Sequence, residues 1–460
     1  MSASMTLTKT PEGGHPGPPL GGLENLSSVT HETELRRLPA DWRVVPLREA
    51  YSFTKKPRGL TIPLDDTIPF LPMDAIPIGR VSVSAFEERP SSKLTSGTYI
   101  ENGDLLVAKI TPSFENGKQA IVKWDRPFGF ATTEVIPIQE IEGISDKHYL
   151  FHILLHPEIR ADLAGKMDGT TGRQRLSKEV LGAKQIPLPP LPEQRKIAGV
   201  LGLVQRALEQ QERLIALTTE LKKALLHQLF TQGLRGEPQK QTEIGLVPES
   251  WQVVNLEHVT QIERGKFTHR PRNEPRFYGG QTPFVQTGDV SSCDGRIREY
   301  SQTLNEEGVL ISKVFPAGTI LITIAANIGF SGILEFDSAC PDSLIGLTPN
   351  ERIDIEFLQH YLTTQQPVMD RLAPRGTQKN INIQFLKPWL VPLPSSDEQS
   401  EIREALNAVD SKTRVVRRKH AALTALFRTL LHQLMTAQIR VDELDMNLLN
   451  EGENNAPVQN

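Results

Sequence analysis

The stretch at residues 187–231, PLPPLPEQRKIAGVLGLVQRALEQQERLIALTTELKKALLHQLFT, occurs twice in this chain. Laid without a gap on residues 392–436, PLPSSDEQSEIREALNAVDSKTRVVRRKHAALTALFRTLLHQLMT, it is identical at 18 of 45 positions. Unrelated segments would match at very few positions, so the chain contains an internal duplication. We therefore expect the 460 residues to divide into two related halves, each closed by one copy.

Each copy begins with Pro-Leu-Pro and then shows the start of a helix. Pro192 and Glu193 suit a first helical turn, and Ser396 with Gln399 three residues later forms a capping-box pattern. No proline follows for about forty residues, which at roughly 1.5 Å per residue predicts a helix of about 60 Å. Apolar side chains recur at alternating steps of four and three residues, with some slippage in the first copy. This period indicates a seam between two helices, and we expect the two copies to be partners.

Each half also opens with the same strand pattern. LPADWRVVPL at 38–47 reappears as VPESWQVVNL at 247–256, with an aromatic residue followed by alternating apolar residues. Between this opening and the long helix, short β-branched runs separated by Gly, Pro and Asn predict a strand-rich globule of about 150 residues. The clearest expected strands and helices are at 103–110, 318–325, 147–163 and 355–372.

Composition limits the classes of protein to be considered. A net charge of −4 with a pI near 6.3 argues against a protein that coats nucleic acid indiscriminately, although one face can still be basic. No run of about twenty apolar residues occurs, so we expect no transmembrane helix. The chain opens without a secretory signal pattern, and its two cysteines are Cys293 and Cys340. We expect a cytoplasmic, reduced protein without a disulfide framework or metal site.

The sequence lacks the common motifs for catalysis. The sequence has no phosphate-binding G-x-x-x-x-G-K-[ST] loop, no dinucleotide fingerprint and no Asn-Pro-Pro-aromatic motif of amino-methyltransferases. Pro341-Asp342 lacks a Glu-x-Lys at nuclease spacing. His227 and His432 repeat, but each lies beside leucine near a helix end, which favours packing, helix-dipole or partner contacts over catalysis. We therefore expect no catalytic residues and no enzymatic activity in this chain.

Basic residues do gather in ERGKFTHRPRNEPRFYGG at 263–280, beside aromatic residues. Arginine suits both phosphate and the O6/N7 edge of guanine, so this loop is a candidate DNA-reading element; a solvated surface loop is the alternative. Weaker counterparts lie in the first half and in the polar loops before both long helices, GTTGRQRLS and RGTQKNINI. The candidate DNA contacts are Lys55, Lys56, Arg58, Lys109, Arg173, Gln174, Arg175, Arg264, Lys266, Arg270, Arg272, Arg276, Arg375, Gln378, Lys379 and Asn380.

With these motifs in place, the chain resembles the specificity (S) subunit of type I restriction-modification systems over residues 38–439. The resemblance is carried by the paired entries PLPPLPEQRKIAGVL and VPLPSSDEQSEIREAL, the helix end LLHQLFTQGLRG, the restart EIGLVPESW and the loop GTQKNI. The order and duplication of these motifs are specific, whereas no single motif is. The chain departs from the pattern in its first half, where the loop reads GTTGRQRL and the helix seam is ragged; residues 1–36 lie outside it.

The resemblance implies that each globule is a target-recognition domain and each long helix a spacer, with the helices antiparallel. Two domains would then read the halves of a bipartite, asymmetric DNA target across a fixed gap. The implied partners are double-stranded DNA, two methylation subunits and restriction subunits, with no membrane. S-adenosylmethionine, ATP and Mg are expected on those partners, and no cofactor on this chain. The helix residues expected to dock partner subunits are Glu193, Gln194, His227, Gln228, Glu398, Gln399, His432 and Gln433.

The expected fold is α+β, with two strand-rich target-recognition domains joined by two long helices in an antiparallel coiled coil, as a pseudo-twofold internal repeat. The expected divisions are a disordered tail at 1–36, a recognition domain at 37–186, a spacer helix at 187–235, a linker and second recognition domain at 236–391, a second spacer helix at 392–440 and a disordered acidic tail at 441–460.

Two other interpretations remain open at this point. The chain could be the specificity chain of a related modification or bifunctional restriction system whose enzyme subunits differ. It could also be a non-DNA coiled-coil scaffold with two ligand-binding β-domains, which the acidic net charge favours slightly. The basic loop, the paired polar loops and the order of the motifs favour DNA. The bases that are read cannot be deduced from motifs, because readout depends on side-chain placement and DNA shape.

Overall fold

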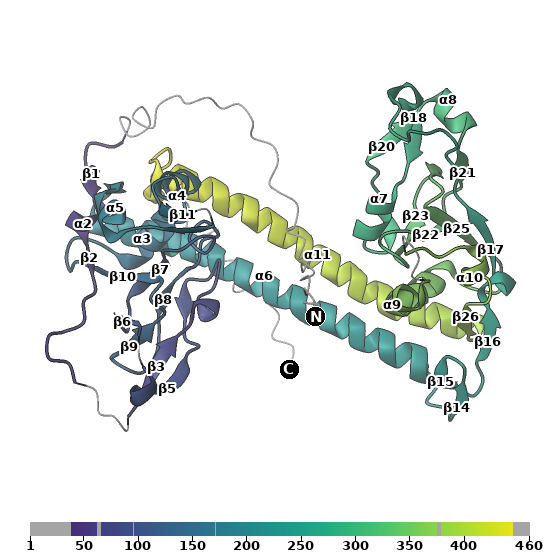
Figure 1. Cartoon of the computed structure of the whole chain (residues 1–460), viewed down its shortest axis with the longest axis horizontal. Coiled ribbons are helices and arrows are strands. Elements are labelled where there is room, and N and C mark those ends of the chain that lie inside the picture. Colours follow the sequence, from purple (N-terminus) through teal and green to yellow (C-terminus); the bar gives the residue numbers. More distant parts are fainter. Residues whose placement is uncertain (1–37, 62–65, 95, 171, 375–378, 445–460) are drawn as a thin grey trace, which may run out of the picture. The chain divides into compact units, whose positions relative to one another are not determined.

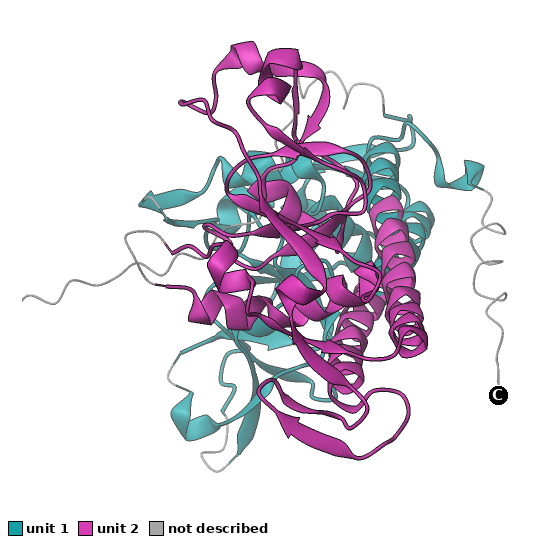
Figure 2. Cartoon of the chain, turned by 90° about the vertical axis from the view of Figure 1, so that its right-hand side faces the viewer, with its two compact units in different colours: residues 1–209, 423–460 teal, residues 210–422 magenta. Residues whose placement is uncertain are grey.

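The computed structural model describes residues 38–61, 66–94, 96–170, 172–374 and 379–444. The chain forms two compact units, residues 1–209 with 423–460 and residues 210–422 (Figure 2). The tail expected at 1–36 and all but four residues of the tail expected at 441–460 lie outside the described residues. Both cysteines are free. None of the helices in the described ranges combines the length and apolar character that crossing a bilayer requires.

The globule of the first unit contains a five-stranded and a four-stranded sheet (Figure 1). The strand orders are β2-β10-β7-β8-β4 and β5-β3-β9-β6. Neighbouring strands are antiparallel except for β4 with β8 and β3 with β9. Two small ladders, β1-β13 and β11-β12, complete it. The element bounds are β1 Arg43–Pro46, α2 Leu47–Ala50, β2 Tyr51–Phe53, β3 Thr67–Leu71, β4 Ser82–Val83, β5 Glu87–Pro90, β6 Thr98–Glu101, β7 Leu105–Ala108, β8 Gln119–Val122, β9 Phe128–Ala131, β10 Val135–Glu140, α3 Lys147–Ile153, α4 Pro157–Ala164, β11 Asp168–Thr170, β12 Arg173–Arg175, α5 Lys178–Ala183 and β13 Gln185–Leu188.

The globule of the second unit repeats this arrangement. Its sheets have the orders β17-β25-β22-β23-β19 and β20-β18-β24-β21, and the parallel pairs β19-β23 and β18-β24 fall at the same places. Two small ladders, β14-β15 and β16-β26, complete it. The element bounds are β14 Gln239–Thr242, β15 Gly245–Pro248, β16 Gln252–Asn255, β17 Thr260–Arg264, β18 Tyr278–Phe284, α7 Thr287–Ser292, β19 Arg296–Ile297, β20 Gln302–Leu304, α8 Glu306–Leu310, β21 Lys313–Phe315, β22 Ile320–Thr323, β23 Ser331–Leu334, β24 Ser338–Cys340, β25 Leu344–Pro349, α9 Ile355–Leu372, α10 Ile383–Leu386 and β26 Leu390–Leu393.

The central strands explain why two divergent sequences fold alike. All four residues of β7, LLVA, and of β22, ILIT, are buried. A continuous apolar run of this length is typical of a strand that is covered on both faces. The strands expected at 103–110 and 318–325 and the helices expected near 147–163 and 355–372 are therefore confirmed, the first of these helical regions being divided into α3 and α4.

The two long helices are α6, Leu191–Gln232, and α11, Ser396–Met435. The Pro-Leu-Pro entries precede both helices and begin inside β13 and β26, in two-stranded ladders where a missing N–H is tolerated. Within the second unit, Lys222 of α6 lies 2.6 Å from Asp410 of α11, and Arg235 lies 2.8 Å from Glu401. Residue numbers rise along one helix as they fall along the other, so the helices are antiparallel there.

The seam between the helices is apolar in each unit. In the second unit, Leu229 of α6 belongs to the same core as Ile402 and Leu406 of α11, which are fully buried. In the first unit, Ile197 and Leu201 of α6 share a core with three apolar residues near the end of α11, namely Leu431, Leu434 and Met435. The period read from the sequence therefore predicted the partner of each helix, and the α+β fold with an antiparallel helix pair is confirmed.

A buried Glu-Gln pair joins each long helix to its globule. Glu398 accepts a hydrogen bond from the indole N–H of Trp251 at 3.0 Å. Gln399 donates to the carbonyls of Arg352 and Pro394, both at 3.1 Å, and accepts from the N–H of Asp354 at 2.7 Å. In the first unit, Glu193 and Gln194 make the corresponding bonds to Trp42, Ile144, Pro189 and Asp146.

Replacing Gln399 by methionine should destabilise the second unit. Gln399 is 2% exposed, and the change leaves one buried and two partly buried main-chain groups without their partner. An unsatisfied buried group costs about 1–3 kcal/mol, so we expect a loss of at least about 1 kcal/mol in the free energy of unfolding, measured by urea denaturation. The exposed Gln228 of α6 provides the matched control, and Gln228→Met should change stability by less than about 0.5 kcal/mol. Equal effects of the two substitutions would contradict the assignment.

Asp104 should make the first unit less stable as pH rises. Burial raises the pKa of this fully buried carboxyl from 3.8 to about 6, despite hydrogen bonds from Thr54 and the N–H of Glu101. A group with a raised pKa in the folded state imposes no penalty below its unfolded pKa and a full penalty above its folded pKa. The change corresponds to about 3 kcal/mol. Between pH 4 and pH 7, Asp104→Asn should therefore gain about that much unfolding free energy relative to the unaltered chain, whereas a difference independent of pH would refute the assignment.

Candidate nucleic-acid interface

Four segments of the second globule meet at one end of its five-stranded sheet. The chain leaving β17 bonds to the start of β25 through the N–H of Gly265 and the carbonyl of Leu344, at 2.9 Å. Ile324, just after β22, donates to Ser343 at 3.2 Å and accepts from Ile381 at 3.0 Å. The β17 end, the β24–β25 connection, the β22 end and the polar loop before α10 are thereby brought together.

Three arginines of the predicted basic loop converge on Asp342 in the β24–β25 connection. The Nε of Arg264 donates to the main-chain carbonyl of Asp342 at 2.7 Å. The carboxylate of Asp342 accepts from Arg270 at 3.0 Å and from Arg272. All three arginines and Lys266 are exposed. The loop therefore presents a fixed group of guanidinium donors, the geometry that recognition of phosphate or guanine requires.

The aromatic residues of the same loop serve the core. Phe267 and Phe277 are 2% and 3% exposed and pack with Phe284 under the four-stranded sheet. Tyr278 is half-buried, and its hydroxyl donates to the carbonyl of Arg272. Phe267 and Phe277 therefore anchor the basic loop and are not available to stack on bases. Arg276 is exposed beside Glu307, at 3.5 Å.

The first unit places a smaller basic group at the equivalent end of its sheet. The β11–β12 hairpin bonds to the chain after β7, through Thr111 N–H to the carbonyl of Gln174 at 3.1 Å and Leu176 N–H to that of Lys109 at 2.7 Å. Arg175 pairs with Glu134 through two bonds of 2.8 and 3.0 Å. The predicted candidates Lys109, Arg173, Gln174 and Arg175 thus belong to one site.

The remaining candidates are less closely tied to these groups. Lys55, Lys56 and Arg58 are exposed on the chain that follows β2, and none of the contacts among the described residues joins them to the hairpin. Lys379 pairs with Asp370 at 2.8 Å, and Asn380 is exposed and bridges to the end of β22. Arg375 and Gln378 lie outside the described residues.

The burial of four predicted docking residues corrects our expectation for them. Glu193, Gln194, Glu398 and Gln399 are between 0% and 7% exposed and bond to their own globules. They were expected to dock a partner because the resemblance implies that the long helices carry the partner subunits. The exposed His227 and Gln228 and the half-exposed His432 and Gln433 stay predicted docking residues.

The repeated histidines have different surroundings. His432 stacks on His156 in the first unit, with ring nitrogens 3.3 Å apart, and lies 3.2 Å from the amide of Gln438. His227 is exposed on α6 and borders a cavity with Phe230 and Leu246. Repetition of a histidine in the sequence therefore does not correspond to one shared environment.

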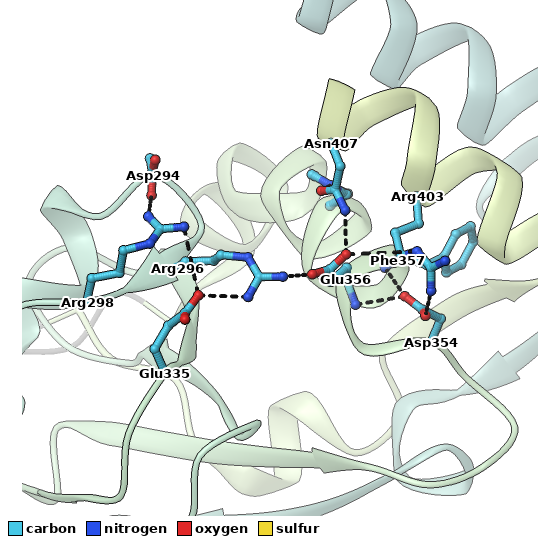
Figure 3. Close-up of polar contacts among 10 residues, drawn as sticks. Asp294, Arg296, Arg298, Glu335, Asp354, Glu356, Phe357, Arg403 and Asn407 are labelled. Carbon is cyan, nitrogen blue, oxygen red and sulfur yellow. Dashed lines mark hydrogen bonds and ion pairs between the residues drawn. The ribbon is translucent and has the colours of Figure 1, made fainter. Parts of the chain in front are cut away.

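A network of charged residues connects the second globule to α11 (Figure 3). Arg296 of β19 pairs with Glu356 of α9, which also accepts from Asn407 of α11. Arg403 of α11 pairs with Asp354 at 2.8 Å. The network joins the start of α9 and the β19 edge to the long helix.

Sequence reasoning missed Asp342 and Glu134, the carboxylates that hold the arginines. Both lie in short connections between strands, and no motif distinguishes them from other acidic surface residues. The one signal in the sequence is that Asp342 follows a proline just ahead of an apolar strand.

Comparison with known proteins agrees with this geometry. A sequence profile of the type I restriction modification DNA specificity domain matches residues 89–219 and 248–425, more than half of the chain. The chain is 24% identical over 429 residues to the type I restriction enzyme MjaVIII specificity subunit of Methanocaldococcus jannaschii, covering 89% of this chain and 95% of that one. It is 25% identical over 408 residues to the EcoBI specificity subunit of Escherichia coli, covering 80% of each.

The fold is also found in a solved structure. The S subunit of a type I restriction-modification system from M. genitalium superposes with a TM-score of 0.56 at 17% identity, covering 86% of this chain and 96% of that one. The two profile matches fall one in each globule; the first includes Glu134 and the β11–β12 hairpin, and the second includes Asp342 and the basic loop. The chain therefore belongs to the family of type I restriction modification DNA specificity domains.

Proposed function

We propose that the two globules read the two halves of a bipartite, asymmetric DNA target. As a member of the specificity family, the chain is the DNA sequence-specificity subunit of a type I restriction-modification system and is not itself an enzyme. One observation carries the proposal: the same sheet occurs twice, and the same end of it bears two different arginine-containing loops. Two similar sheets that carry different loops suit a DNA target whose two halves differ in sequence.

The readout we propose is divided between phosphate and base contacts. Phosphate contacts position a protein on the duplex, and base-edge contacts specify the sequence. In the second unit, the hydrogen bonds of Arg264 within the described chain engage only its Nε, which leaves two terminal amino groups for the O6/N7 edge of guanine. The exposed Lys266 suits a phosphate. Arg272, whose side-chain hydrogen bonds within the described chain engage only its Nη2, would read beside Arg264. In the first unit, Arg173, Arg175 and Lys109 would take the corresponding roles.

The long helices are proposed to set the number of unread base pairs between the half-sites. Each helix has one end in each unit. Half-site spacing follows from protein geometry in other DNA-binding proteins, and joining both globules in one chain makes the second engagement intramolecular.

A partner surface is supported by exposed leucines on α6. Leu214, Leu217 and Leu221 are 39%, 56% and 49% exposed, and their spacing of three and four residues places them on one helix face. We infer that methylation subunits, two per chain, dock on the helix pair, and that restriction subunits join this assembly. S-adenosylmethionine, ATP and Mg are proposed to bind those subunits, and the assembly to work in the cytoplasm.

A non-DNA scaffold is not favoured, because the family match includes both globules. A specificity chain of a related modification or bifunctional system would use the same reading surfaces with different enzyme subunits. The identity of the neighbouring genes distinguishes that case.

The combined substitution Arg264→Ala and Lys266→Ala should weaken recognition of one half-site. We expect co-expression of the chain with its methylation subunit, followed by single-molecule sequencing of methylated adenines, to give a two-part motif with a fixed gap. The double variant should weaken binding to that motif by about tenfold to a hundredfold, because a bidentate arginine–guanine contact contributes about 1–3 kcal/mol. Arg352→Ala, an exposed arginine of the same unit outside the site, is the control. Unchanged methylation by the folded double variant would remove these residues from the interface.

Leu217→Glu should weaken assembly with the methylation subunit. Burial of a leucine contributes about 1.5–3 kcal/mol, so the dissociation constant should rise at least about tenfold. The matched control is Leu310→Glu on α8, because Leu310 is an exposed leucine, at 83%, away from the long helices. Co-purification and analytical ultracentrifugation measure both variants. Equal loss from both variants, or from neither, would exclude this helix face as the docking surface.

A further inference from the structure

We propose that one carboxylate in each unit, Asp342 and Glu134, positions the DNA-reading arginines and so sets base discrimination without contacting a base. The inference rests on the proposed function and names residues that act inside it. Asp342 would govern the half-site read by the second unit, and Glu134 the half-site read by the first.

The two carboxylates occupy nearly the same place in the repeat. Glu134 lies between β9 and β10, and Asp342 lies between β24 and β25, which are the corresponding strands. The register can be followed through main-chain bonds: Lys109 after β7 donates to the carbonyl of Glu134 at 2.9 Å, and Ile324 after β22 donates to that of Ser343 at 3.2 Å. Glu134 therefore aligns with the residue directly after Asp342.

The arginines that these carboxylates hold come from different parts of the two halves. In the first unit, Arg175 comes from the β11–β12 hairpin that precedes the long helix. In the second unit, Arg270 and Arg272 come from the loop after β17. The position of the carboxylate is thus shared by the two repeated sheets. The loop that supplies the arginines bound to it differs between the two units. This arrangement is expected of a carboxylate that positions arginines in two domains reading different DNA sequences.

Electrostatics alone would disfavour a carboxylate at a surface that contacts DNA. A carboxylate beside DNA repels phosphate, so it weakens the sequence-independent attraction. Fixing an arginine before binding reduces the ordering that binding otherwise requires. The cluster of Arg264, Arg270 and Arg272 keeps an excess of positive charge over the single Asp342, so attraction to DNA is retained while orientation is gained.

The geometry separates positioning from direct reading. An acidic side chain can read cytosine by accepting a hydrogen bond from its N4 amino group. Both oxygens of Asp342 are already used, Oδ2 by Arg270 at 3.0 Å and Oδ1 by Arg272. Both oxygens of Glu134 are used by Arg175, at 2.8 and 3.0 Å. The Arg175 hydrogen bond also lowers the pKa of Glu134, so this carboxyl is ionised at neutral pH.

The test uses the full chain in complex with its methylation subunit. The probes are fluorescent duplexes that carry the methylated motif, the same motif with a single base-pair change in either half, and an unrelated sequence. Anisotropy at one stated salt concentration gives a dissociation constant for each duplex. The ratio between the altered and intact motif defines discrimination in each half. The half read by the second unit is the one lost in the Arg264 and Lys266 double variant.

Asp342→Asn keeps the shape of the side chain but turns an N–H₂ group toward one of its two arginines. We expect discrimination in the second unit's half-site to fall about tenfold, with the other half unchanged and binding to the unrelated duplex equal or tighter. Glu134→Gln should give the mirror result in the first unit's half-site. Asp342→Glu restores the charge at a different position, and discrimination should stay low. Glu351→Gln removes an exposed charge of the same unit outside the site and should leave every ratio unchanged.

Discrimination that stays unchanged in both halves for both variants would overturn the proposal. So would a change confined to the loss of one preferred cytosine, since that would mean direct reading. A complex that binds all duplexes alike before any substitution would instead refute the proposed function. Should the Asp342 variant fail to assemble, Glu134→Gln tests the same claim in the other unit.

Discussion

The amide of Gln399, buried where α11 begins, is the contact on which the second unit depends. It binds the carbonyls of Pro394 and Arg352 and the N–H of Asp354, whose side chain caps the start of α9. The entry to the long helix, the loop before α9 and the cap of α9 are therefore held by one side chain. Gln194 makes the same three kinds of bond at the start of α6. Because an unsatisfied buried amide or carbonyl is costly, each globule has one favourable orientation on its own helix end.

The two units then differ in how the next turns of the helix meet the globule. On α11 the contacts are charged, with Arg403 and Asn407 bonded to the start of α9 (Figure 3). The aligned residues of α6 are Ala198 and Gly202, which carry no charge and line a cavity with Asp146 and His152. One repeat thus uses an ion-pair network at a place where the other leaves a cavity. Ion pairs fix direction but are weakened by salt.

Charge explains how a chain with a net charge of −4 can present a DNA-reading surface. Most basic residues of the second globule pair with nearby acids, as Lys313 does with Glu263 and Lys379 with Asp370. Around Asp342 the balance is reversed, because three arginines gather at one acidic residue, two of them on its carboxylate and Arg264 on its main-chain carbonyl. Local excess, rather than total charge, sets the potential that a duplex meets.

The duplication, the two long helices, the seam between them and the central strands could all be predicted from the sequence, because they depend on local period and on residue identity at equivalent places. It also indicated the basic loop at 263–280, since composition is visible without coordinates. Tertiary structure alone decided which polar residues face inward. The Glu-Gln pair at each helix start is polar and would be expected at the surface. The tryptophan bonded to the glutamate lies about 150 residues away in the chain, and the glutamine bonds to main-chain groups about 50 residues away. The roles of Asp342 and Glu134 were hidden for the same reason, because strand order determines which loop reaches which connection, and strand order is not encoded in any local pattern.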